Sequence, residues 1–385
     1  MVSKRLRPFL KYPFDELEKA KDESVRAGIK VIDFGVGDPE RLYVKEIEDY
    51  LIQALQDNDA YRYPCYEGEK ELRESFCKFY AERYGVKLEP EKECLVLIGS
   101  KEGIAHIALS IVNPGELCVV PDPGYPVYSF SIKLASGRVK RIRLTEKNSW
   151  LPELSGIDSA AKLIFVNYPS NPTGSVAPAE FFNDLVRLAK RIGAIVVNDA
   201  AYAELYFDKP THSILEIPGA KDLAAEFHSA SKTFGAPGLR IGFIVGSPKL
   251  IAALAKLKKN IDSGQFKPIQ KALANAYKKP ELIDSVREIF KKRRKLFYDK
   301  LKPILPNLNL PPATFYIWWK IPEELRFPNS YEFSKFLINK FGVVVLPGAA
   351  MGKGGENYVR FSLTLDEKEL ELGCDRLVKL WSEKS

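Results

Sequence analysis

The sequence predicts an α/β protein: a large domain with a mainly parallel seven-stranded sheet, plus a small α+β domain built from both chain ends. Short apolar runs alternate with longer helical patterns from about residue 69 to residue 246, as they do in parallel sheets. Several of these runs are nearly continuous in apolar residues, which is typical of strands covered on both faces. After Gly246 this alternation ends, so a second domain of a different class is expected.

Seven apolar runs are the expected strands of the large sheet. They are residues 94–98, 117–120, 139–144, 162–167, 194–198, 225–229 and 240–245. Residues 178–192 carry apolar side chains at the helical period and therefore predict a helix between two of these strands. Two further long helices are expected, at residues 248–259 and 280–301.

The last part of the chain predicts a smaller mixed domain. Its expected strands are residues 313–320, 343–346 and 358–363, and its expected helices are residues 330–340 and 367–381. We expect the N-terminal stretch, to about Gln56, to pack with these elements. The predicted division is therefore an N-terminal arm and part of the small domain (1–57), a large domain (58–280) and a small C-terminal domain (281–385). A length of 385 residues suits two domains.

Composition indicates an intracellular protein. Apolar residues make up 45% and charged residues 28% of the chain, which is ordinary for soluble globular proteins. The five cysteines form no CxxC pair and the three histidines are scattered, so neither a disulfide framework nor a metal site is indicated. There is no pattern typical of a signal peptide and no apolar run of about 18 residues. We therefore predict a cytoplasmic location and no membrane partner.

The net charge of +8 is spread along the chain. Its densest basic runs, residues 256–259 and 291–295, lie in helix-like segments, where a solvated helix face is the simpler interpretation. No nucleic-acid partner is expected.

Lys232 lies just beyond an expected buried strand, in the segment Ser-Ala-Ser-Lys-Thr-Phe-Gly. Desolvation disfavours a charged ammonium there, and the same effect suits a lysine that must become an imine or a neutral base. The hydroxyls of Ser229 and Ser231 and the guanidinium of Arg240 are groups that bind a phosphate dianion. The alternative is a surface lysine and arginine beside a flexible loop.

Three polar residues follow other expected strands. Asn171 follows the strand at 162–167, whereas Asp199 ends the strand at 194–198 and precedes Tyr202 by three positions. Open α/β sheets form their ligand crevice at such strand ends. A carboxylate there can keep a pyridine nitrogen protonated, and the amide and hydroxyl can bond a phenolic oxygen. Taken singly, Asn171 can also be a turn residue and Asp199 a helix N-cap.

Two further segments fit the same crevice. Ser100, Lys101 and Glu102 begin an expected helix directly after a strand, where free N–H groups can bind phosphate; a simple N-cap by Ser100 is a compatible alternative. Tyr125 follows Pro-Gly in a turn and can stack on a cofactor ring or simply pack. The glycines at 35–37 and 352–355 do not have the spacing of dinucleotide or Walker motifs.

In this order and spacing, the motifs around Lys232, Asn171, Asp199 and Tyr202 resemble fold-type I pyridoxal-phosphate aminotransferases of class I/II. The resemblance covers almost the whole chain. It implies that pyridoxal 5′-phosphate is the cofactor and that Lys232 holds it as a Schiff base and later moves a proton. It also implies that Asp199 pairs with the ring nitrogen and that Asn171 and Tyr202 bond the phenolate oxygen. The remaining implied cofactor contacts, mostly at the phosphate, are Ser100, Lys101, Glu102, Tyr125, Ser229, Ser231 and Arg240.

The resemblance also implies contacts to the substrate and to a second subunit. Arg360, which the sequence alone would suggest is an exposed strand arginine, matches the residue that grips the substrate α-carboxylate. Gly37 and Asn171 would lie beside the same substrate. Tyr63 matches a tyrosine that reaches the phosphate in the neighbouring subunit, so a homodimer is implied.

A narrower resemblance is to the LL-diaminopimelate aminotransferase branch, through residues 34–39, 199–202, 226–229, 260–266 and 313–318. It implies amino transfer between LL-diaminopimelate and 2-oxoglutarate, in lysine biosynthesis. The chain departs from this branch at residues 40–44, where relatives commonly carry Pro-Thr-Pro, and at the bulky Trp319. An aspartate, alanine or aromatic aminotransferase, a C–S lyase and a pyridoxal-phosphate-binding regulatory module remain as alternatives.

Overall fold

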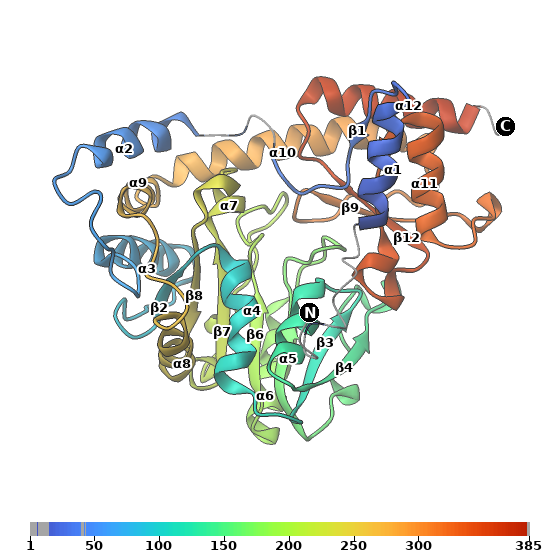
Figure 1. Cartoon of the computed structure of the whole chain (residues 1–385). Coiled ribbons are helices and arrows are strands. Elements are labelled where there is room, and N and C mark those ends of the chain that lie inside the picture. Colours follow the sequence, from blue (N-terminus) through green and yellow to red (C-terminus); the bar gives the residue numbers. More distant parts are fainter. Residues whose placement is uncertain (1–5, 7–14, 40–41, 43, 383–385) are drawn as a thin grey trace.

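The computed structural model describes residues 6, 15–39, 42 and 44–382. Figure 1 shows a large α/β body around a central sheet, with a smaller group of helices and strands beside one end of that sheet. The first blue helix, residues 15–26, lies together with the red C-terminal segments in the smaller group.

The large sheet has seven strands in the order β2-β8-β7-β6-β5-β3-β4. Strands β7, β6, β5, β3 and β4 run parallel to one another, whereas β8 is antiparallel to both β2 and β7. The predicted seven-stranded, mainly parallel sheet is therefore confirmed. Along the chain the strands are Cys94–Leu97 (β2), Leu117–Asp122 (β3), Arg138–Arg143 (β4), Ala161–Val166 (β5), Ile195–Asp199 (β6), Ala224–Ser229 (β7) and Gly242–Gly246 (β8).

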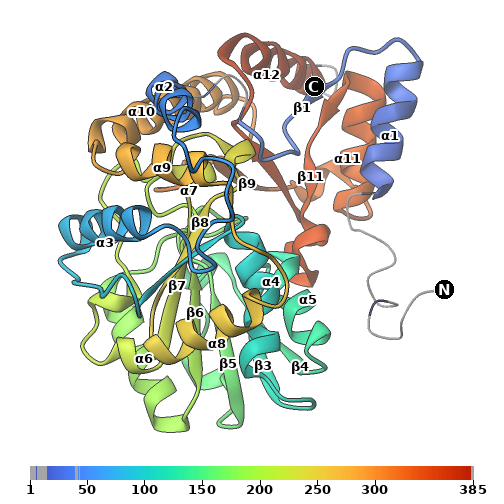
Figure 2. The same cartoon turned by 60° about the vertical axis from the view of Figure 1, so that its left-hand side comes forward.

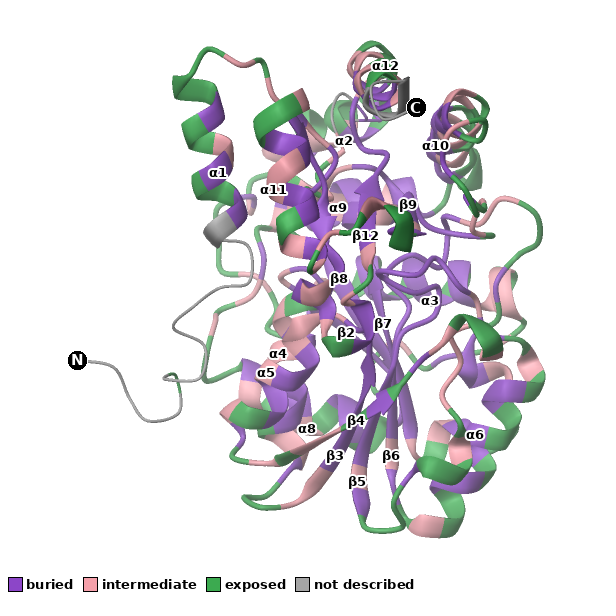
Figure 3. Ribbon diagram, turned by 90° about the vertical axis from the view of Figure 1, so that its right-hand side faces the viewer, coloured by how far each residue is buried: buried purple, intermediate pink, exposed green. Residues whose placement is uncertain are grey.

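Helices cover both faces of this sheet (Figure 2). Alternate residues of one strand enter different apolar clusters: Leu95 packs in one, with α4, α5 and α8, whereas Val96 packs in the other, with α3 and α6. The near-continuous apolar runs thus arise because both faces are buried, as the burial colouring of Figure 3 shows. These helices are Lys70–Tyr84 (α3), Ser100–Ile111 (α4), Pro126–Leu134 (α5), Ala179–Ile192 (α6) and Pro248–Lys258 (α8).

The smaller group joins the two ends of the chain. Ile32–Asp33 (β1) pairs in parallel with Val343–Val344 (β10), and Asp15–Arg26 (α1) packs on Ser330–Phe341 (α11). A separate antiparallel sheet has the order β11-β12-β9. Its strands are Leu346–Pro347 (β11), Tyr358–Ser362 (β12) and Tyr316–Lys320 (β9), and the helices Pro280–Leu301 (α10) and Glu367–Ser382 (α12) pack on one another nearby.

One N-terminal element departs from the expected packing. Lys45–Leu55 (α2) packs mainly on Lys267–Ala276 (α9), which in turn packs on α3 of the large body. The expectation that the whole stretch to Gln56 packs with the small domain is therefore wrong for α2. The division at residues 57 and 280 stays a prediction. No helix in the described part of the chain is both long and apolar enough to span a membrane.

Candidate active site

A cavity of about 470 Å³ lies between the end of the large sheet and the small domain. Of the residues that we predicted for the site, twelve line it, and only Glu102 and Tyr63 do not. The twelve are Gly37, Ser100, Lys101, Tyr125, Asn171, Asp199, Tyr202, Ser229, Ser231, Lys232, Arg240 and Arg360. They come together because the carboxyl ends of β5, β6 and β7 meet at one edge of the sheet.

Lys232 belongs to the short helix Ala230–Thr233 (α7), directly after β7. Its Nζ donates a hydrogen bond to the Gly37 carbonyl oxygen at 2.9 Å. Burial lowers the pKa of Lys232 to about 8; the charge of Asp38 opposes this shift, and the charges of Arg360 and Arg240 reinforce it. The amine is therefore far easier to deprotonate than an ordinary lysine, as a nucleophile or base requires.

Asp199 is buried at the end of β6. Tyr128 Oη donates to its Oδ2 at 2.7 Å and the Ala201 N–H donates to its Oδ1 at 3.2 Å. Burial nevertheless raises the pKa of Asp199 to about 6. A cationic ring nitrogen beside this carboxylate would favour its ionised form, so the environment fits a protonated pyridine. Sequence reasoning missed Tyr128, whose position in an apolar helix gives no sign of a polar partner.

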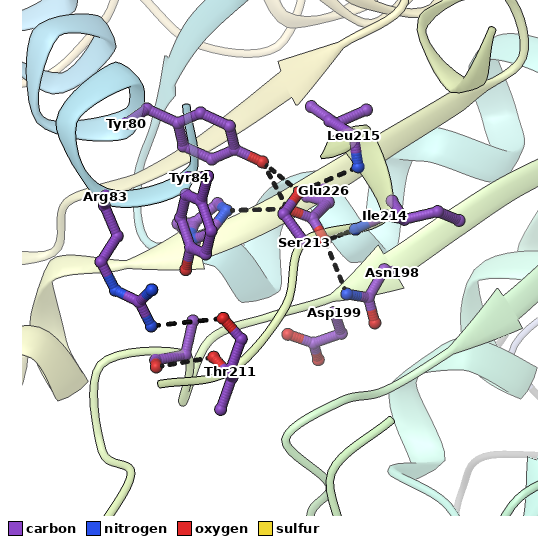
Figure 4. Close-up of polar contacts among 12 residues, drawn as sticks. Tyr80, Arg83, Tyr84, Asn198, Asp199, Thr211, Ser213, Ile214, Leu215 and Glu226 are labelled. Carbon is purple, nitrogen blue, oxygen red and sulfur yellow. Dashed lines mark hydrogen bonds and ion pairs between the residues drawn. The ribbon is translucent and has the colours of Figure 1, made fainter. Parts of the chain in front are cut away.

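A network of polar side chains surrounds Glu226 on β7, the strand next to β6 (Figure 4). Asn198 Nδ2 donates to Glu226 Oε1 at 2.8 Å, and the hydroxyls of Tyr80 and Ser213 donate to Oε2 at 2.6 and 2.7 Å. Burial alone would raise the pKa of Glu226, but His228 and these hydrogen bonds outweigh burial and lower it. The network therefore favours an ionised carboxylate on the strand next to the one that carries Asp199.

Arg360 is buried, so the interpretation as an exposed strand arginine is wrong. Its Nη1 donates to Asn171 Oδ1 at 2.7 Å and its Nη2 donates to the Gly35 carbonyl at 2.8 Å. The Nε–H is buried and donates to no acceptor among the described residues. A guanidinium with a spare donor inside the cavity fits recognition of a carboxylate.

Tyr316, on β9, is a second site residue that sequence reasoning did not single out. Its hydroxyl lies 3.0 Å from that of Tyr202. The guanidinium carbon of Arg360 lies over its ring, 3.9 Å from the ring centroid. A Cβ at position 37 would collide with the Tyr316 hydroxyl, so glycine is required at position 37 for this close approach.

The start of α4 forms the polar end of the cavity. Gly99, at φ +74°, occupies the N-cap position and no side chain caps the helix; Ser100 is the first helical residue, so its interpretation as the N-cap is wrong. Arg240 lies directly against Gly99, where a Cβ would collide with the guanidinium. Uncapped helix N–H groups, an arginine and the hydroxyls of Ser229 and Ser231 fit a phosphate dianion.

The two predicted residues outside the cavity have other surroundings. Glu102 Oε1 lies 2.9 Å from His106 Nδ1, and its Oε2 accepts a hydrogen bond from the Ile98 N–H. Tyr63 is 86% exposed. Within this single chain, neither side chain can contact a ligand of the cavity.

The chain departs from the LL-diaminopimelate aminotransferase pattern at residues 40–44 and at Trp319. Residues 40, 41 and 43 lie outside the described part of the chain. Trp319 is buried, and its indole N–H donates to the Pro306 carbonyl at 2.9 Å. Trp319 does not line the cavity, so its bulk does not bear directly on what the cavity holds.

Known proteins are similar to this chain in both sequence and fold. The chain is 42% identical to LL-diaminopimelate aminotransferase of Halothermothrix orenii, over 97% of this chain and 96% of that protein. It is 41% identical to the enzyme of the same name from Aquifex aeolicus, over 98% of each. Substrate-bound BacF of Bacillus subtilis superposes with a TM-score of 0.93, at 32% identity over 99% of this chain and 98% of that chain.

The family described as aminotransferase class I and II matches residues 29–377. This match includes the strands and loops that carry Lys232, Asp199, Asn171 and Arg360 to the cavity. The chain belongs to the class I and II aminotransferases.

Proposed function

We propose that this enzyme uses pyridoxal 5′-phosphate to transfer an amino group between LL-diaminopimelate and 2-oxoglutarate, in cytoplasmic lysine biosynthesis. The observation that carries the substrate assignment is the identity of 42% and 41%, over nearly the full length, to two relatives named LL-diaminopimelate aminotransferase. The cavity supports the cofactor, because its polar groups match a phosphate, a ring nitrogen and a reactive aldehyde in separate places.

Each group of the cavity would have a separate task. When bound, the cofactor supplies an electron sink for the charge that develops as the substrate Cα loses its proton. Lys232 would hold the cofactor through its amine and, once released, move the proton at the substrate Cα. A pKa of about 8 suits both tasks, because the neutral amine is accessible near physiological pH.

The other residues would bind and orient. Asp199 would face the ring nitrogen, and Asn171 and Tyr202 the ring oxygen. Arg360 would hold the α-carboxylate beside Gly37. The phosphate would lie among the uncapped N–H groups of α4 and the side chains of Ser100, Lys101, Ser229, Ser231 and Arg240, with Tyr125 beside the ring and Glu102 contributing only backbone.

We also propose a homodimer in which Tyr63 reaches the phosphate of the neighbouring site. Tyr63 is 86% exposed, and Tyr61, Ile261 and Phe266 are also exposed large apolar side chains. The rings of Tyr61 and Phe266 pack together with centroids 6.1 Å apart. Exposed aromatic side chains gathered in this way are typical of a protein interface.

The test is a donor comparison on the purified, cofactor-loaded enzyme. LL-diaminopimelate, aspartate, alanine and phenylalanine are each supplied with 2-oxoglutarate, and glutamate formation is measured, with Lys232→Ala as the inactive control. We expect LL-diaminopimelate to give the highest kcat/KM. Brisk turnover of another donor without turnover of LL-diaminopimelate contradicts the substrate assignment, and pyruvate and ammonia released without an acceptor indicate a lyase.

A separate experiment tests the cofactor. Borohydride reduction followed by peptide mass mapping should find the cofactor attached to Lys232. Attachment to a different lysine, or none, contradicts the site assignment whatever the donor comparison gives.

A further inference from the structure

A second cavity, of about 600 Å³, lies outside the candidate active site. It is bounded by β9 and β12 of the small domain, which run side by side in Figure 1, by the loop after β5 and by the proline-rich segment 307–312. The same elements serve both cavities: Arg360 and Tyr316 face the active site, whereas Tyr358 and Trp318, two residues away along each strand, line the second cavity.

Three aromatic rings form a corner in this second cavity. The rings of Trp318 and Tyr358 are parallel to within 3°, with centroids 5.1 Å apart. The ring of Trp150 stands nearly perpendicular to both, at 83° to Trp318 and 80° to Tyr358, with centroids 6.5 and 5.4 Å away. All three side chains are only half-buried, so the corner is open to a ligand.

A carboxylate lies beside this corner. Glu146 lines the same cavity and is exposed, and it forms no ion pair with any residue in the described part of the chain. Its proximity to the Tyr358 hydroxyl is reflected in the pKa of that group, which burial and the charge of Glu146 raise and the charge of Arg143 lowers. The other charged lining residue, Lys320, is already 3.9 Å from Glu323. Among the described residues that line the cavity, Glu146 is the one carboxylate.

We propose that this second cavity binds a small molecule through an ammonium group, which would lie in the corner of Trp150, Trp318 and Tyr358 with Glu146 as its counter-ion. Ring faces attract cations through their quadrupole, most strongly when the cation is partly desolvated. Leu310, Pro311 and Pro312 line the same cavity and supply apolar surface for the attached carbon chain. Polar and apolar residues share the lining in similar numbers, so the aromatic corner and Glu146 are the features that favour an ammonium group.

Titration with n-butylammonium chloride, followed by tryptophan fluorescence of the full-length enzyme, tests this proposal. We expect a saturable change, and none with the neutral isostere 1-butanol at equal concentration. Trp150→Leu should weaken binding by about tenfold, as expected for loss of a partly desolvated cation–π contact. Glu146→Gln should weaken it by a few-fold, because one counter-charge is lost. Glu180→Gln, the same charge change at an exposed position on α6, should leave binding unchanged.

Two results overturn the proposal: no saturable response to n-butylammonium, or a response that Trp150→Leu and Glu146→Gln both leave intact. Thermal midpoints of the variants show that each is folded, so a lost response reports on the cavity. A parallel titration with norleucine distinguishes the source of the ammonium group. Tighter binding of norleucine indicates an amino acid, whereas tighter binding of n-butylammonium indicates a simple amine.

Discussion

Asp199 and Glu226 are buried carboxylates on the adjacent strands β6 and β7, yet their pKa values move in opposite directions. Burial raises the pKa of Asp199 to about 6, whereas the pKa of Glu226 is lowered although burial opposes this. Asp199 accepts one side-chain and one backbone hydrogen bond. Glu226 accepts bonds from three side chains and from the Ile214 N–H, and lies 3.4 Å from His228 Nε2.

The difference shows how one sheet holds two buried carboxylates in contrasting surroundings, one lining the cavity and one within a network of donors. On the cavity side, Asp199 is left short of donors and gains its full stabilisation only when a cationic ligand is present. On the other side, Glu226 has all the donors it needs from the protein. Substitutions on the cavity side should therefore affect mainly activity, and those around Glu226 should affect mainly stability.

The largest expected effect is on the cavity side. Lys232→Met should lower kcat by about 10⁴-fold, the upper range for loss of an acid–base group. Because the folded-state pKa of Lys232 is lowered to about 8, its ionised form destabilises the fold below that pH, and the stability is regained only as pH rises toward the unfolded value. The variant's thermal midpoint at pH 7, without cofactor, should therefore equal or exceed that of the unchanged protein; a lower midpoint would contradict the separation of roles.

The next largest effect is expected on stability, from substitutions of Glu226. Glu226→Ala should lower the free energy of unfolding by about 3–5 kcal/mol, because it leaves several buried donors without their acceptor and removes the carboxylate beside His228. Urea denaturation at pH 7 measures this change. Glu226→Gln, which keeps the shape and one acceptor oxygen, is the matched control and should cost less. If both variants are as stable as the parent, the network has no structural role.

Asp199→Asn should change stability in the opposite direction from Glu226→Ala: it should increase the free energy of unfolding. The folded-state pKa of Asp199 is raised to about 6, so its contribution to stability is full below the unfolded value and is lost as pH rises through 6. The cofactor-free variant should therefore be more stable than the parent at pH 8, by about 3 kcal/mol, and equal to it near pH 4. Urea denaturation at both pH values checks this; a variant destabilised at pH 8 would refute it.

The smallest expected effect concerns Tyr128, the one side chain among the described residues that donates to Asp199. Tyr128→Phe removes the 2.7 Å hydrogen bond, which should raise the pKa of Asp199 further and reduce kcat/KM by about tenfold, as expected for a bond to a charged group. The loss should be greater at pH 6 than at pH 8, because protonated Asp199 cannot pair with a cationic ring nitrogen. A loss that does not change with pH would place Tyr128 in a merely structural role.

Much of the fold could be predicted from the sequence because both faces of the large sheet are apolar. Each of the seven strands lies within a few residues of its predicted run. The antiparallel direction of β8 was not predictable, because an apolar run carries no sign of its direction. The packing of α2 on α9 was missed for a similar reason: an amphipathic helix does not specify which neighbour covers it.

The candidate site was predictable where polar residues interrupt the ends of apolar strands, as Asn171, Asp199 and Lys232 do. Tyr128, Tyr316 and the Glu226 network were not, because their roles depend on contacts between distant segments. The Glu226–Tyr80 pair joins residues on β7 and α3. Glu102 shows the converse, since a residue at the right place in a motif can turn its side chain toward its own helix.

The pairing of β1 with β10 also constrains the order in which the parts of this protein can fold during synthesis. The first strand to be synthesised has its partner near the other end of the chain, so it must wait unpaired until almost the whole polypeptide has emerged. Contacts of such long sequence separation carry a large loop-closure cost and form late. The side of the cavity where Arg360 donates a hydrogen bond to the Gly35 carbonyl is therefore expected to be completed last, after the side formed by the large sheet has folded.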